Sequence, residues 1–419
     1  MTHVAPRPWS APLVTALREA TWLTRERALA YGRILLVMSL TAAVVWTALA
    51  HGGLDRMGKP LGTDYASFWT ASKLALGGHP LQVYDITAHH AEQTRLFGRD
   101  VGYSAFFYPP IYLLICLPLA LLPYFASLAV WLGVTGLAYW RVVRAWLGDR
   151  FGALAIFSFP AVLVNIGHGQ NGFLTTALFG GGALMLDRRP IVAGMLFGCM
   201  VYKPQLGLVI PLALIAAGRW KTIGAAAATV LILAGLSAAL FGLDAWRGFL
   251  AVSPVAKAAL EQDLVGYAKM QSTFAGVRLL HGGLGLAYAV QIAVALAACA
   301  GLVLLQRRSF RSGAEGPAMM TAALLASPFL LDYDLLLLAI PLAWMAREGL
   351  RTGFRPWEKL VLALAFVLPL MSRSVASTIG LPLAPIVIGA VFVLVLRRGL
   401  EPADSAANRS AGLFRLTSA

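Results

Sequence analysis

The sequence predicts an all-α, polytopic membrane protein. Hydrophobic residues make up 59% of the 419-residue chain and charged residues only 13%, and the mean hydropathy is +0.73. Apolar runs separated by polar segments recur along most of the chain. A helix needs about 20 apolar residues to cross a bilayer. These observations exclude a soluble globular domain and a protein with one membrane anchor.

The apolar runs are expected to form the membrane helices, and several are shorter than a bilayer requires. We therefore expect some broken, tilted or re-entrant helices held among their neighbours. Three prolines interrupt the run 106–122, so this run is expected to be re-entrant. The chain is then expected to cross about ten to twelve times. In chain order, the predicted helices are 33–50, 106–122, 125–140, 151–166, 173–186, 191–202, 206–217, 223–241, 284–305, 317–330, 335–346, 360–370 and 381–396.

Lys and Arg predict which side of the membrane each connection faces. The long connections 51–105 and 242–283 carry similar numbers of basic and acidic residues, so most of the net charge of +15 lies elsewhere. Basic connections stay in the cytoplasm, which makes both long loops exoplasmic. Charge spread over helix ends needs no nucleic acid to explain it, and none is expected as a partner. The basic segments are 1–32, 141–150, 187–190, 218–221, 306–316, 347–359 and 397–419.

This topology gives a cytoplasmic segment 1–32, a membrane domain 33–396 and a cytoplasmic tail 397–419 that is expected to be disordered. The first apolar run ends in Ala48-Leu49-Ala50, which resembles a signal-peptidase site, but the long segment before it favours an uncleaved signal anchor. The three cysteines lie singly in apolar runs, so no disulfide framework is expected.

The first long loop places an acid beside an aromatic-rich helix. Residues 65–76 are predicted to be helical, with Tyr65, Phe68 and Trp69 on one face. This pattern suits a helix lying on the membrane surface with its aromatic rings in the headgroup layer. Asp64 directly precedes the helix.

Polar residues at membrane depth are costly and are therefore candidates for function. Under the predicted topology they open toward the same exoplasmic face as Asp64. These motifs are Tyr108-Pro109-Pro110, Gly167-His168-Gly169-Gln170-Asn171, Tyr202-Lys203-Pro204-Gln205, Ser327-Pro328 and Asp332-Tyr333-Asp334.

The order of these motifs, from Asp64 to the acidic turn at 332–334, resembles glycosyltransferase family 87 over roughly residues 33–346. That family consists of bacterial membrane enzymes of the GT-C fold that use polyprenol-phosphate-mannose. The resemblance implies a GT-C-type bundle of about 10–12 transmembrane helices with exoplasmic loop helices. It also implies a hexosyltransferase of the bacterial inner membrane, with its active site on the periplasmic side. The chain departs from the family pattern at two places: Phe68-Trp69 stands where a second tyrosine is common, and the acidic turn at 332–334 has no His. Both departures bear on the identity of the sugar and the acceptor.

The resemblance also assigns roles to residues. Asp64 is expected to be the general base that removes a proton from the acceptor hydroxyl, which attacks opposite the leaving phosphate and inverts the anomeric carbon. Lys203 is expected to meet the charge of that phosphate, with Arg278 and Arg373 as alternatives. The other residues expected to bind donor or substrate are Tyr108, Gln170, Asn171, Arg278, Asp332 and Asp334.

The expected partners are a polyprenyl-phosphate-linked sugar donor, a glycan or lipid acceptor and membrane lipids. No metal-binding cluster is evident in the sequence, so no cofactor is expected, and the question of a divalent metal stays open.

Structural roles compete with these assignments. Asp64 is also a good helix N-cap, and Lys203 could extend its amine to the interface. Gln170 and Asn171 could simply join helices. Asp332 and Asp334 could be solvated turn residues.

Two other functions also compete. A secondary transporter would suit the broken helices, but it should show related halves and charges at the membrane midplane, which the sequence lacks. A lipid-glycan polymerase or ligase would be expected to carry a late loop rich in Arg and His. Loop 242–283 holds only Arg247, Arg278 and His281 of those types.

Overall fold

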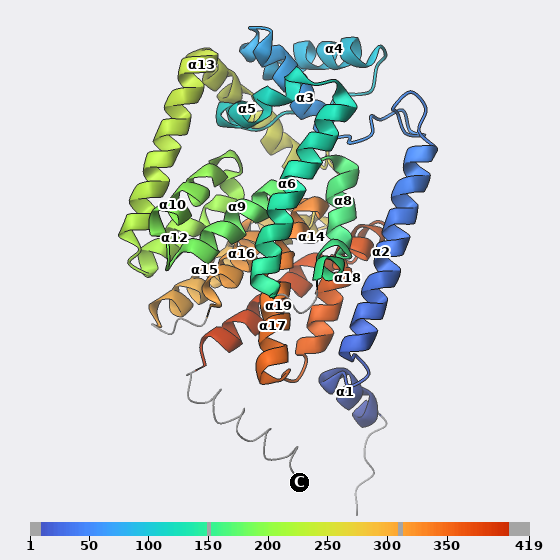
Figure 1. Ribbon diagram of the computed structural model, residues 1–419, viewed down its shortest axis with the longest axis vertical. Coiled ribbons are helices and arrows are strands. Elements are labelled where there is room, and N and C mark those ends of the chain that lie inside the picture. The colour runs from blue at the N-terminus through green and yellow to red at the C-terminus, as the bar shows by residue number, and fades with distance from the viewer. Residues whose placement is uncertain (1–9, 149–151, 309–312, 402–419) are drawn as a thin grey trace, which may run out of the picture.

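The computed structural model describes residues 10–148, 152–308 and 313–401, and this part of the chain is built from helices without a strand. Among these residues, five helices are long and apolar enough to cross a membrane. The predicted all-α, polytopic membrane class is therefore confirmed (Figure 1). The five are α2 (Arg25–Ala48), α6 (Tyr124–Leu147), α13 (Trp220–Glu261), α15 (Leu284–Arg307) and α18 (Glu358–Ile379).

The other apolar runs form shorter or broken helices, several of which begin at a proline. A proline in the first turn costs no helical hydrogen bond, so proline can begin a helix without that loss. The shorter elements are α1 (Ser10–Glu19), α3 (Tyr65–Leu76), η1 (Pro80–Val83), α4 (Ile86–Phe97), α5 (Pro110–Cys116), η2 (Leu117–Leu121), α7 (Gly152–Phe157), α8 (Pro160–His168), α9 (Gly172–Met185), α10 (Pro190–Gly198), η3 (Cys199–Tyr202), α11 (Pro204–Gly207), α12 (Val209–Ala216), α14 (Thr273–Leu279), α16 (Glu315–Ala326), η4 (Asp332–Leu338), α17 (Ala339–Thr352) and α19 (Leu383–Gly399).

The first long loop packs against the first part of the second at one end of the molecule. The helix α13 changes direction at Gly242, whose φ of 78° suits glycine, and this break coincides with the predicted start of the second loop. Beyond it, the ring of Phe249 lies 6.1 Å from that of Tyr84 in the first loop. The short helices α3, α4 and α5 lie at this end, whereas α1 lies at the other (Figure 1).

The helix α3 has the predicted bounds but not the predicted environment. Tyr65, Phe68 and Trp69 are 0%, 1% and 7% exposed, and Phe68 packs edge-on against Tyr112 and Trp131. The prediction that these rings lie in the lipid headgroup layer is wrong. The rest of the loop and α6 cover the helix, and helical periodicity cannot reveal such a cover.

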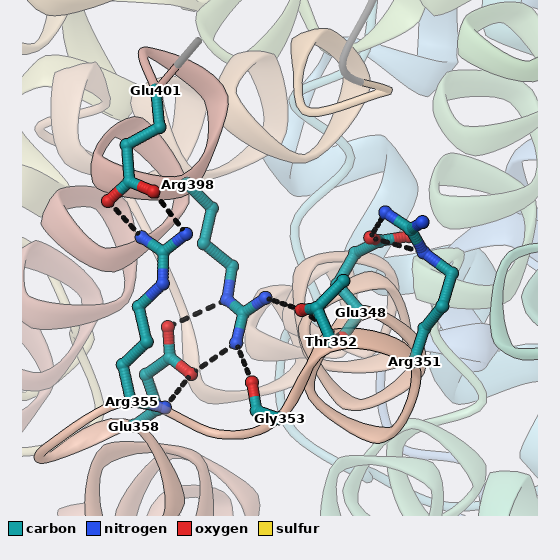
Figure 2. A network of polar contacts seen from close by, with 8 residues as sticks. All are labelled: Glu348, Arg351, Thr352, Gly353, Arg355, Glu358, Arg398 and Glu401. Atoms are coloured by element: carbon teal, nitrogen blue, oxygen red, sulfur yellow. Dashed lines mark hydrogen bonds and ion pairs between the residues drawn. The ribbon is translucent and has the colours of Figure 1, made fainter. Parts of the chain in front are cut away.

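A charged network fastens the ends of α17, α18 and α19 together (Figure 2). The Arg398 guanidinium donates to both carboxylate oxygens of Glu358 at 2.7 and 2.5 Å, and to the carbonyl of Gly353 at 2.8 Å. Arg355 forms a bidentate pair with Glu401 at 2.6 Å. Arg398 therefore belongs to the folded helix and not to a tail, whereas most of the predicted disordered tail, 402–419, lies outside the described residues.

Candidate active site

Asp64 lies at the start of α3, and its side chain makes no capping hydrogen bond to that helix. The backbone N–H of Asp64 donates to the carbonyl of His168 at 3.0 Å, which docks the start of α3 onto the end of α8. The carboxylate is 27% exposed. The interpretation of Asp64 as a helix cap is therefore wrong, and its oxygens are directed to other partners.

Gln170 holds the Asp64 carboxylate. Its side-chain N–H donates to Asp64 Oδ2 at 3.1 Å. Its side-chain oxygen accepts from the backbone N–H of Asn171 at 2.9 Å and from the Tyr108 hydroxyl at 3.4 Å. These contacts fix the amide so that its N–H group faces the carboxylate.

A glycine makes this approach between α3 and α8 possible. Gly169 ends α8 with a φ of +62°, and a Cβ there would lie 2.5 Å from the Cβ of Tyr65 and 3.0 Å from Leu128. The carbonyl of Gly169 accepts from Trp131 Nε1 of α6 at 3.1 Å. Only glycine combines this conformation with so close a contact.

His168 is a second neighbour of Asp64 that the predicted site residues did not include. Its Nδ1 lies 3.6 Å from Asp64 Oδ2 and 3.1 Å from the Thr63 hydroxyl. Its ring lies 5.7 Å from that of Tyr333, in an edge-to-face arrangement. The sequence signal was its position beside Gln170 in the glycine-rich turn.

The surroundings of Asp64 keep it ionised. Burial raises the pKa of a carboxyl, but the hydrogen bond and charge of His168, the charge of Lys269 and the hydrogen bond from Gln170 together outweigh burial and lower the pKa of Asp64 to about 2. Asp64 is therefore a carboxylate at neutral pH. A hydroxyl that approaches it meets a hydrogen-bond acceptor.

Lys203 and Asp334 form a buried ion pair. Lys203 Nζ lies 2.7 Å from Asp334 Oδ1, and the two side chains are 3% and 4% exposed. The other carboxylate oxygen accepts from the backbone N–H of Leu331 at 3.1 Å. Lys203 does not extend to an interface and Asp334 is not a solvated turn residue, so both of those interpretations are wrong.

Tyr333 connects this pair to the surroundings of Asp64. Besides His168, its ring faces Lys203 Nζ at 5.3 Å and Lys269 Nζ at 5.8 Å. Lys269 comes from the second long loop and is half-buried. No motif marked it in the sequence, because only the folding of loop 242–283 onto η4 brings it here. That folding is fixed by a 2.7 Å hydrogen bond from Gln271 N–H to the carbonyl of Leu330.

An aromatic wall lies beside Gln170. The rings of Tyr108 and Tyr112 are 4.4 Å apart, and Tyr112 stacks on Tyr202 at 5.0 Å. Asn171 is fully buried and its amide donates to the Tyr112 hydroxyl at 3.2 Å, while its side-chain oxygen has no hydrogen-bond partner. Asn171 therefore joins helical elements, as its alternative structural role predicts, and its side-chain oxygen remains an unused hydrogen-bond acceptor.

Two of the predicted residues lie toward the edge of this cluster. Asp332 is 4% exposed, accepts from the backbone N–H of Tyr333 at 3.0 Å and lies 3.6 Å from Arg373, so it is not a solvated turn residue either. Arg278 donates to the Tyr267 hydroxyl at 3.1 Å and to the carbonyl of Gly282 at 2.9 Å. Arg278 lines a cavity of about 620 Å³ whose lining does not include Asp64. Among the described residues, no group of three or more His, Cys, Asp or Glu side chains could hold a metal ion.

Of the comparisons with known proteins, one finds a match. No curated protein and no solved structure matches the chain. The model of the family described as Glycosyltransferase family 87 matches residues 106–331, which is more than half of the chain. That range includes the Gln170 turn, Lys203 and Lys269, and Asp64 precedes it. With its apolar helices and this match, the chain belongs to glycosyltransferase family 87 and is a membrane glycosyltransferase.

Proposed function

We propose that this glycosyltransferase moves a hexose, with mannose as the best candidate, from a polyprenyl-phosphate donor to a glycan, lipid or other acceptor. The observation that carries the proposal is the Asp64 carboxylate, which caps no helix, is partly exposed and is oriented by Gln170. An oriented carboxylate at the mouth of a polar cluster is what deprotonation of a sugar or lipid hydroxyl requires.

Asp64 is the proposed general base of an inverting reaction. Because its pKa is about 2, Asp64 is a weak base toward a free hydroxyl. It first accepts a hydrogen bond from the acceptor and then takes the proton late, once the new bond to the anomeric carbon has made the hydroxyl acidic. His168 is the proposed positioning residue, because it lies beside the same carboxylate oxygen that Gln170 holds.

The proposed phosphate site lies around Tyr333. The ammonium groups of Lys269 and Lys203 both face the Tyr333 ring, but Lys269 is half-buried, whereas Lys203 is fully buried and its charge is offset by Asp334. Lys269 would therefore meet the donor phosphate first, and Lys203 would contribute once its ion pair loosens. Tyr108, Gln170 and Asn171 would hydrogen-bond sugar hydroxyls. Arg278 and Asp332, at the edge of the cluster, are proposed to bind parts of the donor that lie farther from Asp64.

We place the site on the exoplasmic side of a bacterial inner membrane. The first long loop and the part of the second that follows Gly242 lie at one end of the molecule, and the N-terminal helix α1 lies at the other (Figure 1). This separation supports the orientation derived from Lys and Arg. The family resemblance supports the bacterial setting.

The test is transfer of radiolabelled mannose from polyprenyl-phosphate-mannose in membranes containing the full chain. We expect a mannosylated product that is absent from membranes without the protein, with a linkage inverted relative to the donor. Transfer from a nucleotide sugar but not from the lipid donor would contradict the proposed donor. A retained configuration would contradict the single-carboxylate mechanism.

The membership in family 87 sets aside the transporter alternative. A polymerase or ligase that relies on basic residues of the late loop gains no support from Arg278, whose guanidinium is already bonded to Tyr267 and Gly282.

A further inference from the structure

A second cavity lies between α2 and the helix bundle, away from the candidate active site. Its volume is about 500 Å³. It is lined by the C-terminal part of α6, from Tyr139 to Leu147, whereas Leu128 near the start of α6 touches the turn beside Asp64. At about 1.5 Å per residue, the two sites are separated by roughly 20 Å along this helix.

The cavity has the depth of one membrane leaflet. On α2 its lining runs from Arg25 to Leu35, and on α18 from Lys359 to Val367. Ten residues of helix span about 15 Å, which is half of the roughly 30 Å hydrocarbon core. Both linings therefore begin at a basic residue and end near the middle of the bilayer.

The two ends of the cavity differ in chemistry. Arg25, Thr24 and Lys359 stand at the mouth, and Lys359 Nζ also reaches the carbonyl of Ala20 at 3.5 Å. The remaining depth is lined mostly by apolar side chains, which are Leu29, Leu35, Val143, Ile156, Leu362 and Phe366 among others.

Residues beside the mouth suit the membrane surface. The helix α1 and the turn after it expose Leu13 (63%) and Trp22 (39%), and tryptophan is enriched at the headgroup level of membranes. The backbone of α1 is fastened to the start of α18 by a 2.7 Å hydrogen bond from Trp357 N–H to the Arg18 carbonyl. The mouth is thus placed where lipid phosphates lie.

We infer that this cavity binds one anionic phospholipid of the leaflet on the basic side of the protein. Its phosphate lies between Arg25 and Lys359, and an acyl chain fills the apolar depth between α2 and α18. The helix α2 contacts the bundle only through a small part of its surface, with 6% of its apolar window buried, so a lipid has lateral access. The sugar donor is a less suitable occupant, because its phosphate must reach Asp64 at the other end. Only this comparison with the sugar donor rests on the proposed reaction.

The test uses the purified full chain in phosphatidylcholine nanodiscs that contain either phosphatidylglycerol or a long polyprenyl phosphate as a minor component. Native mass spectrometry after release into detergent measures the lipid retained. We expect one phosphatidylglycerol per chain. The variant Ala363→Trp, which fills the apolar depth, should abolish retention, whereas Leu364→Trp on the exposed side of the same helix should not.

The charges at the mouth give a second measurement. Arg25→Gln/Lys359→Gln should weaken retention about thirtyfold, the effect of two charges near a membrane surface. Arg188→Gln/Lys221→Gln, which removes two exposed charges outside the lining, should leave retention unchanged. Equal retention of phosphatidylcholine, preference for the polyprenyl phosphate, or full retention by a folded Ala363→Trp variant would each overturn the inference.

Discussion

The buried pair of Lys203 and Asp334 offers a test that separates a structural role from a catalytic one. At 2.7 Å and an effective dielectric constant of about 20, the gross attraction is about 6 kcal/mol, against which desolvation of both groups must be set. Removing one partner leaves a buried charge uncompensated. Lys203→Met should therefore destabilise the protein by about 3–5 kcal/mol.

The double variant Lys203→Met/Asp334→Leu should recover most of that stability, because no charge remains unpaired. Stability is measured as the Tm of detergent-solubilised protein, and the double-mutant cycle isolates the coupling of the two residues. The matched control is the exposed pair of Arg247 and Asp244, also at 2.7 Å. Its disruption should cost at most about 1 kcal/mol.

Sugar transfer by the double variant then decides what Lys203 does. If Lys203 also serves the donor phosphate, the double variant is stable and has lost most of its activity. If the pair only supports the fold, the stable double variant keeps its activity. An unchanged Tm for Lys203→Met would refute the reasoning from burial.

Three further substitutions follow from the geometry. Gly169→Ala forces a Cβ to within 2.5 Å of Tyr65 at a φ of +62°. The loss of stability, measured by Tm, should therefore exceed the roughly 1–2 kcal/mol that this backbone conformation alone costs a residue with a Cβ. Sugar transfer should also fall. His168→Ala removes the largest of the interactions that lower the pKa of Asp64, so this pKa should rise above its value of about 2, and the acid limb of the transfer rate should move to higher pH. Glu358→Leu strands the buried Arg398 guanidinium and should cost about 3–5 kcal/mol, seen as a lower Tm.

Each of these has a control within the chain. Gly167→Ala lies in the same turn, with no atom within 4 Å of the added Cβ, and should be tolerated. His90→Ala removes a histidine that pairs with the exposed Asp100, so the acid limb should not move. Glu348→Leu breaks a pair with an arginine that is 66% exposed and should change the Tm little. An effect in a control as large as in its partner variant would contradict the corresponding argument.

Much of the fold could be predicted from the sequence, because the length of an apolar run and the position of a glycine affect the structure of the chain locally. The bounds of α3 and the break at Gly242 were both predicted from such signals. The burial of Phe68 was not predictable, because periodicity shows that a helix has an apolar face and not whether lipid or protein covers it.

Some features of the candidate site could likewise be predicted from the sequence, and others could not. Gln170 and Lys203 were identifiable because polar groups among apolar runs are costly and stand out. Asp64 was identifiable from its place directly before the aromatic-rich helix and from the family resemblance. The pairing of Lys203 with Asp334 joins residues 131 positions apart. Lys269 reaches Tyr333 only through the fold of the second loop. Neither contact leaves a local signal in the sequence.

The most direct test of the proposed reaction compares Asp64→Asn with Asp85→Asn. Asp85 caps α4 through a 2.9 Å hydrogen bond from the N–H of Ala88, and asparagine caps helices about as well as aspartate. Both variants therefore keep the shape of the side chain, and only Asp64→Asn removes the proposed base. At equal amounts of protein, transfer from polyprenyl-phosphate-mannose should fall at least about a hundredfold in Asp64→Asn and stay near wild type in Asp85→Asn. Full transfer by Asp64→Asn would contradict the role assigned to this carboxylate.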